Sequence, residues 1–115
     1  SQVVWLQSTE SAELAFILMD PRHAVPDYEA EVRPHDLAEL AAQSIDDLAV
    51  FTLVVVPNDK TKVRTNLKAP ILINRKRRLA KQIILDRSAY PVQFYLSQAQ
   101  RDKEVAHARA DAQGG

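Results

Sequence analysis

The feature that most constrains this chain is a series of short apolar runs, each ended within a few residues by proline, charged or turn-forming residues. The longest run covers residues 50–56, and its β-branched and aromatic content is typical of a central strand. An ordinary helix needs a longer segment with a period of about 3.6 residues, which these runs do not provide. The chain is therefore expected to fold mainly as β-sheet.

Shorter segments before and after this run indicate further strands. Residues 63–67 alternate apolar and polar side chains, as in a strand with one buried face. Short turns such as 57–60 and 75–78 separate the segments, and this spacing favours antiparallel pairing over parallel βαβ units. The expected fold is a small antiparallel β-barrel or sandwich. The other expected strands are residues 3–6, 14–19, 28–32, 63–67, 71–73 and 83–85, with a last extended piece from residue 90.

One segment has a helical period and predicts one short helix near residues 35–43. The proline before it suits a first helical turn, because that position needs no backbone N–H. Leu37 and Leu40 share one face of this helix, whereas Asp36 and Glu39 are expected to point mostly outward. The helix is therefore expected to pack one apolar stripe against the sheet.

The length of 115 residues is that of a single domain. We expect a β domain over residues 1–96 and a polar tail over residues 97–115, either helical or disordered, because Gln, Ala, Arg, Asp and Glu dominate there. A strand signal begins almost at once after Ser1, so upstream residues are expected to be missing.

Charge and residue usage exclude several classes of function. Fifteen basic and fifteen acidic residues cancel, so no global field draws the chain to nucleic acid or to an anionic membrane. No apolar run approaches the roughly 18 residues of a membrane span. Cysteine is absent and the only glycines are Gly114 and Gly115, which excludes thiolate metal sites and glycine-rich phosphate loops. No cofactor and no metal site are expected, since His23, His35 and His107 lack metal-ligand spacing.

Two charged clusters leave alternatives open. The basic run 75–78 suggests an RNA-binding β-barrel, but no aromatic residues accompany it, and a charged hairpin turn is the favoured interpretation. The carboxylates of Asp20, Asp27, Glu29 and Glu31 suggest a hydrolase with paired acids, but a solvated acidic edge is the commoner arrangement. Neither cluster by itself predicts an enzyme.

The sequence Pro26-Asp27-Tyr28 suggests a third class, a protein-binding module. A rigid loop that presents tyrosine beside carboxylates suits protein recognition, where tyrosine is a common anchor. The competing interpretation is a structural tyrosine that closes one end of the barrel with its hydroxyl in water. Residue types alone favour neither interpretation.

An ordered set of segments across residues 5–92 forms a recognisable pattern, although no single segment is diagnostic. The segments are Trp5-Leu6-Gln7-Ser8, Leu14-Ala15-Phe16 with Asp20-Pro21, Pro26-Asp27-Tyr28-Glu29, Asn66-Leu67, Ala69-Pro70-Ile71, Ile73-Asn74, Lys81-Gln82 with Leu85, and Tyr90-Pro91-Val92. Together and in this order they resemble the flagellar assembly factor FliW family. The resemblance covers the β domain and implies a non-catalytic, β-rich protein of the cytoplasm. The family has further β-structure upstream of the first segment, so this chain resembles an N-terminally incomplete copy.

The resemblance implies a partner switch that controls flagellin translation. FliW-like proteins bind flagellin and also bind the translational repressor CsrA, so the expected partners are these two proteins, with no direct nucleic acid and no membrane. A solvent-accessible loop with carboxylates would complement a basic partner. The candidate protein-binding residues are Asp20, Pro26, Asp27, Tyr28, Glu29, Glu31, Asn66 and Asn74.

Overall fold

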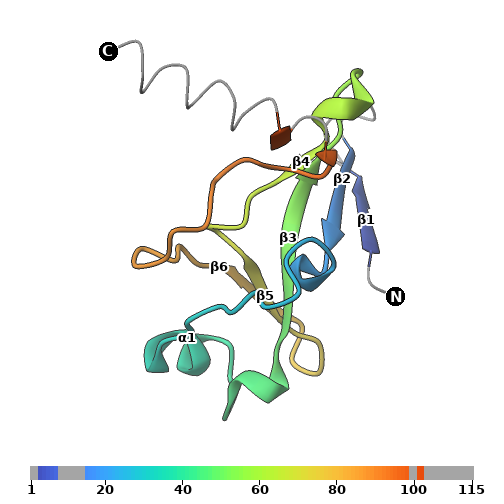
Figure 1. The fold of residues 1–115 in the computed structure, drawn as a ribbon. Coiled ribbons are helices and arrows are strands. Elements are labelled where there is room, and N and C mark those ends of the chain that lie inside the picture. Colours follow the sequence, from blue (N-terminus) through green and yellow to red (C-terminus); the bar gives the residue numbers. More distant parts are fainter. Residues whose placement is uncertain (1–2, 8–14, 99–100, 103–115) are drawn as a thin grey trace.

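The computed structural model describes residues 3–7, 15–98 and 101–102 of the chain (Figure 1). Its helical elements are the α-helix α1 (Pro34–Glu39) and the 3-10 turns η1 (Pro21–His23), η2 (Ile45–Asp47) and η3 (Lys60–Lys62), and Gln98, Arg101 and Asp102 are also helical. The strands are β1 (Val3–Gln7), β2 (Ala15–Met19), β3 (Ala49–Val55), β4 (Arg64–Thr65), β5 (Ile71–Asn74), β6 (Leu79–Gln82) and β7 (Phe94–Tyr95).

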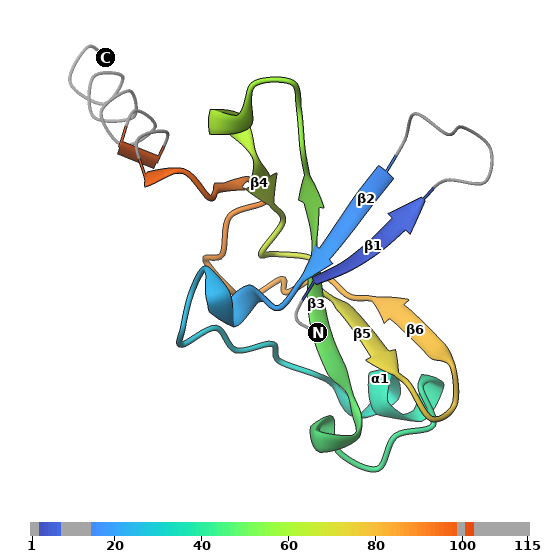
Figure 2. The ribbon, with the colours of Figure 1, turned by 90° about the vertical axis from the view of Figure 1, so that its right-hand side faces the viewer.

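The long strand β3 is the centre of the sheet, and its neighbours are all antiparallel to it (Figure 2). β2 follows one edge of β3, and β1 pairs with β2. The other edge of β3 pairs with β5 along its first half and with β4 near its end. β5 pairs in turn with β6, and β4 pairs with β7. Within the described residues, β1 and β7 form the two ends of the main strand path, so this sheet is not closed into a complete barrel.

An irregular bulge, residues 66–70, separates β4 from β5 and changes the direction of the strand. Thr65 pairs with Val54, but Ile71 pairs with Phe51, so residues 66–70 stand opposite only two residues of β3. The bulged backbone is hydrogen bonded by later segments, with Leu67 N donating to Pro91 O and Leu85 N donating to Lys68 O. Such a bulge bends one strand sharply and increases its twist.

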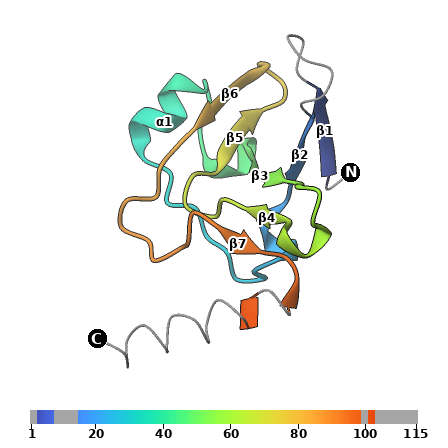
Figure 3. The same ribbon diagram turned by 90° about the horizontal axis from the view of Figure 1, so that it is seen from above.

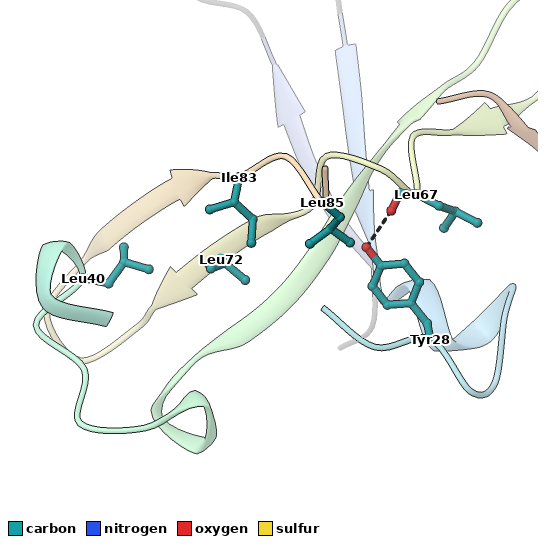
Figure 4. Packing of buried hydrophobic residues seen from close by; sticks show 6 residues of the cluster. All are labelled: Tyr28, Leu40, Leu67, Leu72, Ile83 and Leu85. Carbon is teal, nitrogen blue, oxygen red and sulfur yellow. Dashed lines mark hydrogen bonds between the residues drawn. The ribbon is translucent and has the colours of Figure 1, made fainter. Parts of the chain in front are cut away.

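Figure 3 shows α1 beside the β5–β6 hairpin, and the hydrophobic core lies between these elements and the bulge (Figure 4). Leu40, which follows α1, is only 1% exposed and reaches the core from the helix side. Alternation along β5 buries Leu72 completely, as expected for a strand with one face on a core. The buried members of this cluster are Tyr28, Leu40, Leu67, Leu72, Ile83 and Leu85.

The fold class predicted from the sequence is confirmed: the described part is mainly antiparallel β-sheet with one short helix. The strands expected at residues 3–6, 14–19, 50–56 and 71–73 all form, each with its bounds within about two residues. The helix also forms, but it stops at Glu39, because Ala41 adopts a positive φ of 52° that ends the helical path.

Three strand predictions were wrong in place or length. Residues 28–32 form no strand, because Ala30 and Val32 pack on the core without a neighbouring strand to bond their backbone. Residues 83–85 lie just after β6, whose ladder occupies 79–82 instead. The expected strand 63–67 shrinks to β4, since the bulge begins directly after it. The last extended piece forms its ladder only at β7.

Most of the tail predicted at residues 97–115 lies outside the described residues. Arg101 is described, and its guanidinium donates to the carbonyl oxygens of Tyr95 and Leu96 at 2.7 and 3.1 Å. The same guanidinium lies over the Phe94 ring, 5.1 Å from its centroid. The start of the tail is therefore fastened to the last strand.

Candidate functional site

The segment from Asp20 to Glu31 connects β2 with α1 and contains most of the residues that the sequence proposes for protein binding. Its first part is a rigid turn, because the Asp20 carboxylate accepts a hydrogen bond of 3.0 Å from Arg22 N and so begins η1. Pro21 fixes the backbone at this turn and is buried. The start of the loop therefore has a defined backbone conformation.

Tyr28 fastens the middle of the loop to the core (Figure 4). Its side chain is only 3% exposed, and its hydroxyl donates a hydrogen bond of 2.7 Å to Leu67 O in the bulge. Burial and, to a smaller extent, the neighbouring Tyr90 raise the pKa of the Tyr28 hydroxyl well above its ordinary value. The tyrosine is therefore a structural contact in this chain, and its hydroxyl is bonded to a backbone carbonyl rather than to water.

Tyr90 is a second aromatic support for this loop; the sequence indicated it only within the segment Tyr90-Pro91-Val92 and not as a candidate site residue. Its ring lies 4.6 Å from the Tyr28 ring, centroid to centroid, with a tilt of 31°. Its hydroxyl accepts a hydrogen bond of 3.0 Å from Glu29 N. The backbone that carries the acidic side chains is thus held at Tyr28 and at Glu29.

The three carboxylates of Asp27, Glu29 and Glu31 are exposed on the outer side of the loop. They alternate with Tyr28, Ala30 and Val32, which face the core. Among the described residues, no cation lies within ion-pair distance of these three carboxylates. Within the described part, the loop therefore presents negative charge without an ion-pair partner, on a backbone that is already ordered. Pro26 is exposed at the start of this stretch, whereas Asp20 is half-buried.

Two grooves flank the loop. The first has a volume of about 330 Å³ and lies between the loop and the start of β3, with Asp20, Tyr28 and Phe51 among its lining residues. The second, of about 400 Å³, lies on the other side, between Glu29 and Glu31 and the segment 85–90. A partner that covers the loop could therefore also insert side chains on either side of it.

The two asparagines that the sequence proposed for binding are both engaged in structural hydrogen bonds. Asn66 begins the bulge, since its side-chain oxygen accepts from Lys68 N at 3.0 Å and Ala69 N at 3.1 Å. Asn74 is buried, and its amide donates to Leu40 O at 2.8 Å. Neither asparagine lies in the acidic loop, and their role in binding a partner stays a prediction.

A charged cluster at α1 also differs from expectation, because Asp36 is buried rather than outward. Lys81 Nζ lies 2.6 Å from the Asp36 carboxylate and 2.7 Å from that of Glu39. Burial alone would raise the pKa of Asp36, but hydrogen bonds from Lys81 and from Arg33 N outweigh it, and the nearby His35 adds to the net lowering. The carboxylates of Asp36 and Glu39 in turn raise the pKa of Lys81. The cluster ties α1 to β6.

The described residues contain no group of three or more histidine, cysteine or acidic side chains placed to hold a metal ion. His107 lies outside the described residues. No helix in the described part is both long and apolar enough to cross a membrane. What the structure does offer is an ordered acidic loop between two open grooves, on a small protein of the mainly antiparallel β class.

Comparison with known proteins identifies the family within that class. Residues 1–96 match the family model described as FliW protein, and this chain belongs to the FliW family. The flagellar assembly factor FliW of Caldicellulosiruptor saccharolyticus is 41% identical over 96 residues, which cover 84% of this chain and 63% of the relative. The corresponding factor of Caldicellulosiruptor bescii is 42% identical with the same coverage. The chain thus spans less than two thirds of the length of these relatives.

A solved structure agrees with the sequence comparison. The crystal structure of the flagellar assembly factor FliW superposes with a TM-score of 0.73 at 31% identity and covers 84% of this chain and 69% of that structure. The family resemblance predicted from the sequence is therefore confirmed, and with it the β-rich fold.

Proposed function

We propose that this chain acts as a non-catalytic regulatory binding protein of the cytoplasm, which binds flagellin and the translational repressor CsrA in a partner switch. Membership of the FliW family supports the proposal, since its curated relatives carry the name flagellar assembly factor. The two partners come from the family resemblance. When flagellin occupies the chain, CsrA is free to repress flagellin translation, and when flagellin is exported, the chain returns to CsrA.

The observation that carries the proposal at the level of the surface is the acidic loop. Asp27, Glu29 and Glu31 present negative charge that no cation within the described part of the chain compensates. An RNA-binding repressor such as CsrA is expected to have a basic surface, and complementary charge raises association rate and specificity more than affinity. Because Tyr28 and Tyr90 already order the loop backbone, little conformational entropy is lost when a partner binds.

The switch itself needs only mass action. Two partners that exclude each other compete for one pool of binding protein, and a difference of about 1.4 kcal/mol in binding free energy shifts occupancy tenfold at equal concentrations. No covalent step is required. The proposal is therefore independent of any catalytic group.

The experiment that tests the loop is a charge reversal, Asp27→Lys with Glu29→Lys, followed by titration with purified CsrA and with flagellin. We expect CsrA binding to weaken strongly at low salt and less at high salt, because exposed charges are screened over about 8–10 Å at ordinary ionic strength. Single reversals supply a matched control: Asp27→Lys should weaken CsrA binding, whereas Asp102→Lys, the same charge change at an exposed tail residue, should not. Unchanged binding of both partners by the double variant would exclude this loop as the binding face.

A further inference from the structure

The β5–β6 turn, residues 75–78, displays four consecutive cations on a fixed backbone. All four side chains are exposed. The Asn74 side chain links the turn to the residue after α1. Its oxygen accepts a hydrogen bond of 3.3 Å from Arg77 N, and its amide donates to Leu40 O. Arg78 closes the turn in the left-handed region, with a φ of 56°. As the sequence predicted, these residues form the hairpin connection between β5 and β6.

The cations of this turn form no ion pair within the described part of the chain. No carboxylate there lies within ion-pair distance of Lys76, Arg77 or Arg78. Arg75 instead lies over the Phe51 ring, with its guanidinium carbon 5.7 Å from the ring centroid. Neighbouring like charges repel one another, and an anionic ligand would relieve that repulsion.

A groove of about 470 Å³ lies beside the turn and gives a ligand a place to rest. The turn and η2 both line it, together with the apolar side chains of Ala41, Leu48 and Ala49. Figures 1 and 2 both place the turn, η2 and α1 at the same end of the molecule. The lining residues are Ala41, Gln43, Asp46, Asp47, Leu48, Ala49, Asn74, Arg75, Lys76 and Arg77.

The lining favours a protein segment over a nucleic acid. Nucleic-acid sites that bind single strands stack bases on aromatic side chains, and none of the residues that line this groove is aromatic. Asp46 and Asp47, which also line the groove, would repel a continuous chain of phosphates. A peptide can instead place isolated carboxylates at the cations and a small apolar side chain on Ala41, Leu48 and Ala49.

We propose that the groove between the 75–78 turn and η2 is a docking site for an acidic protein segment, with carboxylates at Lys76 and Arg77 and small apolar residues on the floor. This site has the opposite charge to the acidic loop, so it goes beyond the function proposed above and fits a different kind of partner surface. The two sites are adjacent, since Asp46, Leu48 and Arg75 line both this groove and the groove beside Tyr28.

A fluorescein-labelled peptide of alternating glutamate and alanine tests this proposal by fluorescence anisotropy at low salt. We expect saturable binding that Lys76→Glu with Arg77→Glu weakens by about tenfold or more. The matched control is Lys60→Glu with Lys62→Glu, which makes the same change in net charge at exposed residues of η3, at the other end of β3. This control should change binding by less than about twofold, since those charges lie beyond a screening length of the groove.

Three results would overturn the proposal. The first is no saturable binding of the peptide by the unaltered chain. The second is equal loss in the two double variants, which would mean attraction to net charge alone. The third is tighter binding of a single-stranded oligouridylate than of the peptide, lost on Lys76→Glu with Arg77→Glu, which would make the turn a nucleic-acid site. Unchanged melting temperatures of both variants establish that the comparison concerns binding and not folding.

Discussion

Replacing Tyr28 by phenylalanine tests whether the acidic loop is fastened to the core as described. The substitution keeps the buried ring and removes only the hydroxyl that donates to Leu67 O at 2.7 Å. A typical hydrogen bond contributes about 1 kcal/mol net, and a buried carbonyl left without a partner costs about 1–3 kcal/mol. We therefore expect Tyr28→Phe to lower the free energy of unfolding by about 1–2 kcal/mol. Tyr28→Ala removes the ring as well and should cost about 3–5 kcal/mol.

The assay is urea unfolding at neutral pH, followed by circular dichroism and by fluorescence. Tyr95→Phe is the matched control, because Tyr95 is half-buried and its hydroxyl makes no hydrogen bond within the described residues. This control should change the free energy of unfolding by less than about 0.5 kcal/mol. Equal stability of Tyr28→Phe and Tyr95→Phe would refute the reasoning, since the Tyr28–Leu67 bond would then contribute nothing.

The stabilities of the unaltered chain and of Tyr28→Phe are also expected to differ in their dependence on alkaline pH. The pKa of Tyr28 is raised on folding above its unfolded value of about 10, so its contribution to stability is complete below pH 10 and is lost as the pH rises further. The advantage of the unaltered chain over Tyr28→Phe should therefore shrink by about 1.4 kcal/mol for each pH unit above 10. A constant difference between pH 8 and pH 11 would mean that the hydroxyl is not protected from ionisation.

Three further substitutions test the contacts around α1. Asp36→Ala should lower the free energy of unfolding by about 1 kcal/mol or more at neutral pH, because the hydrogen bond from Arg33 N is lost. Folding lowers the pKa of Asp36, so the difference in stability between the two proteins should fade as the pH drops through the folded pKa. A difference in stability that is unchanged at pH 2 would contradict this prediction. Asn74→Ala should cost about 1–3 kcal/mol, measured by urea unfolding, because Leu40 O and Arg77 N both lose a partner. Ala41→Gly should raise the melting temperature, with a gain of about 0.5–1 kcal/mol, since φ is 52° there; a lower melting temperature would show that the left-handed position is not strained.

The strands that the sequence predicted well are those whose local pattern is sufficient. Residues 50–56 and 71–73 carry β-branched and apolar side chains, and both segments pair as expected in β3 and β5. The strand predictions failed where contacts with segments distant in the sequence determine the local structure. Residues 28–32 alternate like a strand, but the backbone there is held by Tyr90 and by the core instead of by a neighbouring strand. The bulge at 66–70 likewise depends on bonds from residues 85 and 91, which local sequence cannot indicate.

The candidate site was predicted in part for the same reason. Asp27, Glu29 and Glu31 alternate with apolar residues, and this period correctly indicates that they face solvent. The residues around Tyr28 in the sequence fit either a partner-binding tyrosine or a structural one. Only the hydrogen bond from its hydroxyl to Leu67 O identifies it as a structural residue. Asp36 was expected outward because it is charged, yet Lys81, from a strand 45 residues later, allows it to be buried.

The most direct test of the proposed partner switch is whether one molecule of this chain binds CsrA and flagellin at the same time. The measurement is sedimentation velocity of the preformed complex with labelled CsrA while purified flagellin is added in steps. The proposal predicts that labelled CsrA returns to the sedimentation rate of the free protein as the flagellin complex forms. A single heavier species that contains all three proteins would contradict it, because flagellin would then not release the repressor.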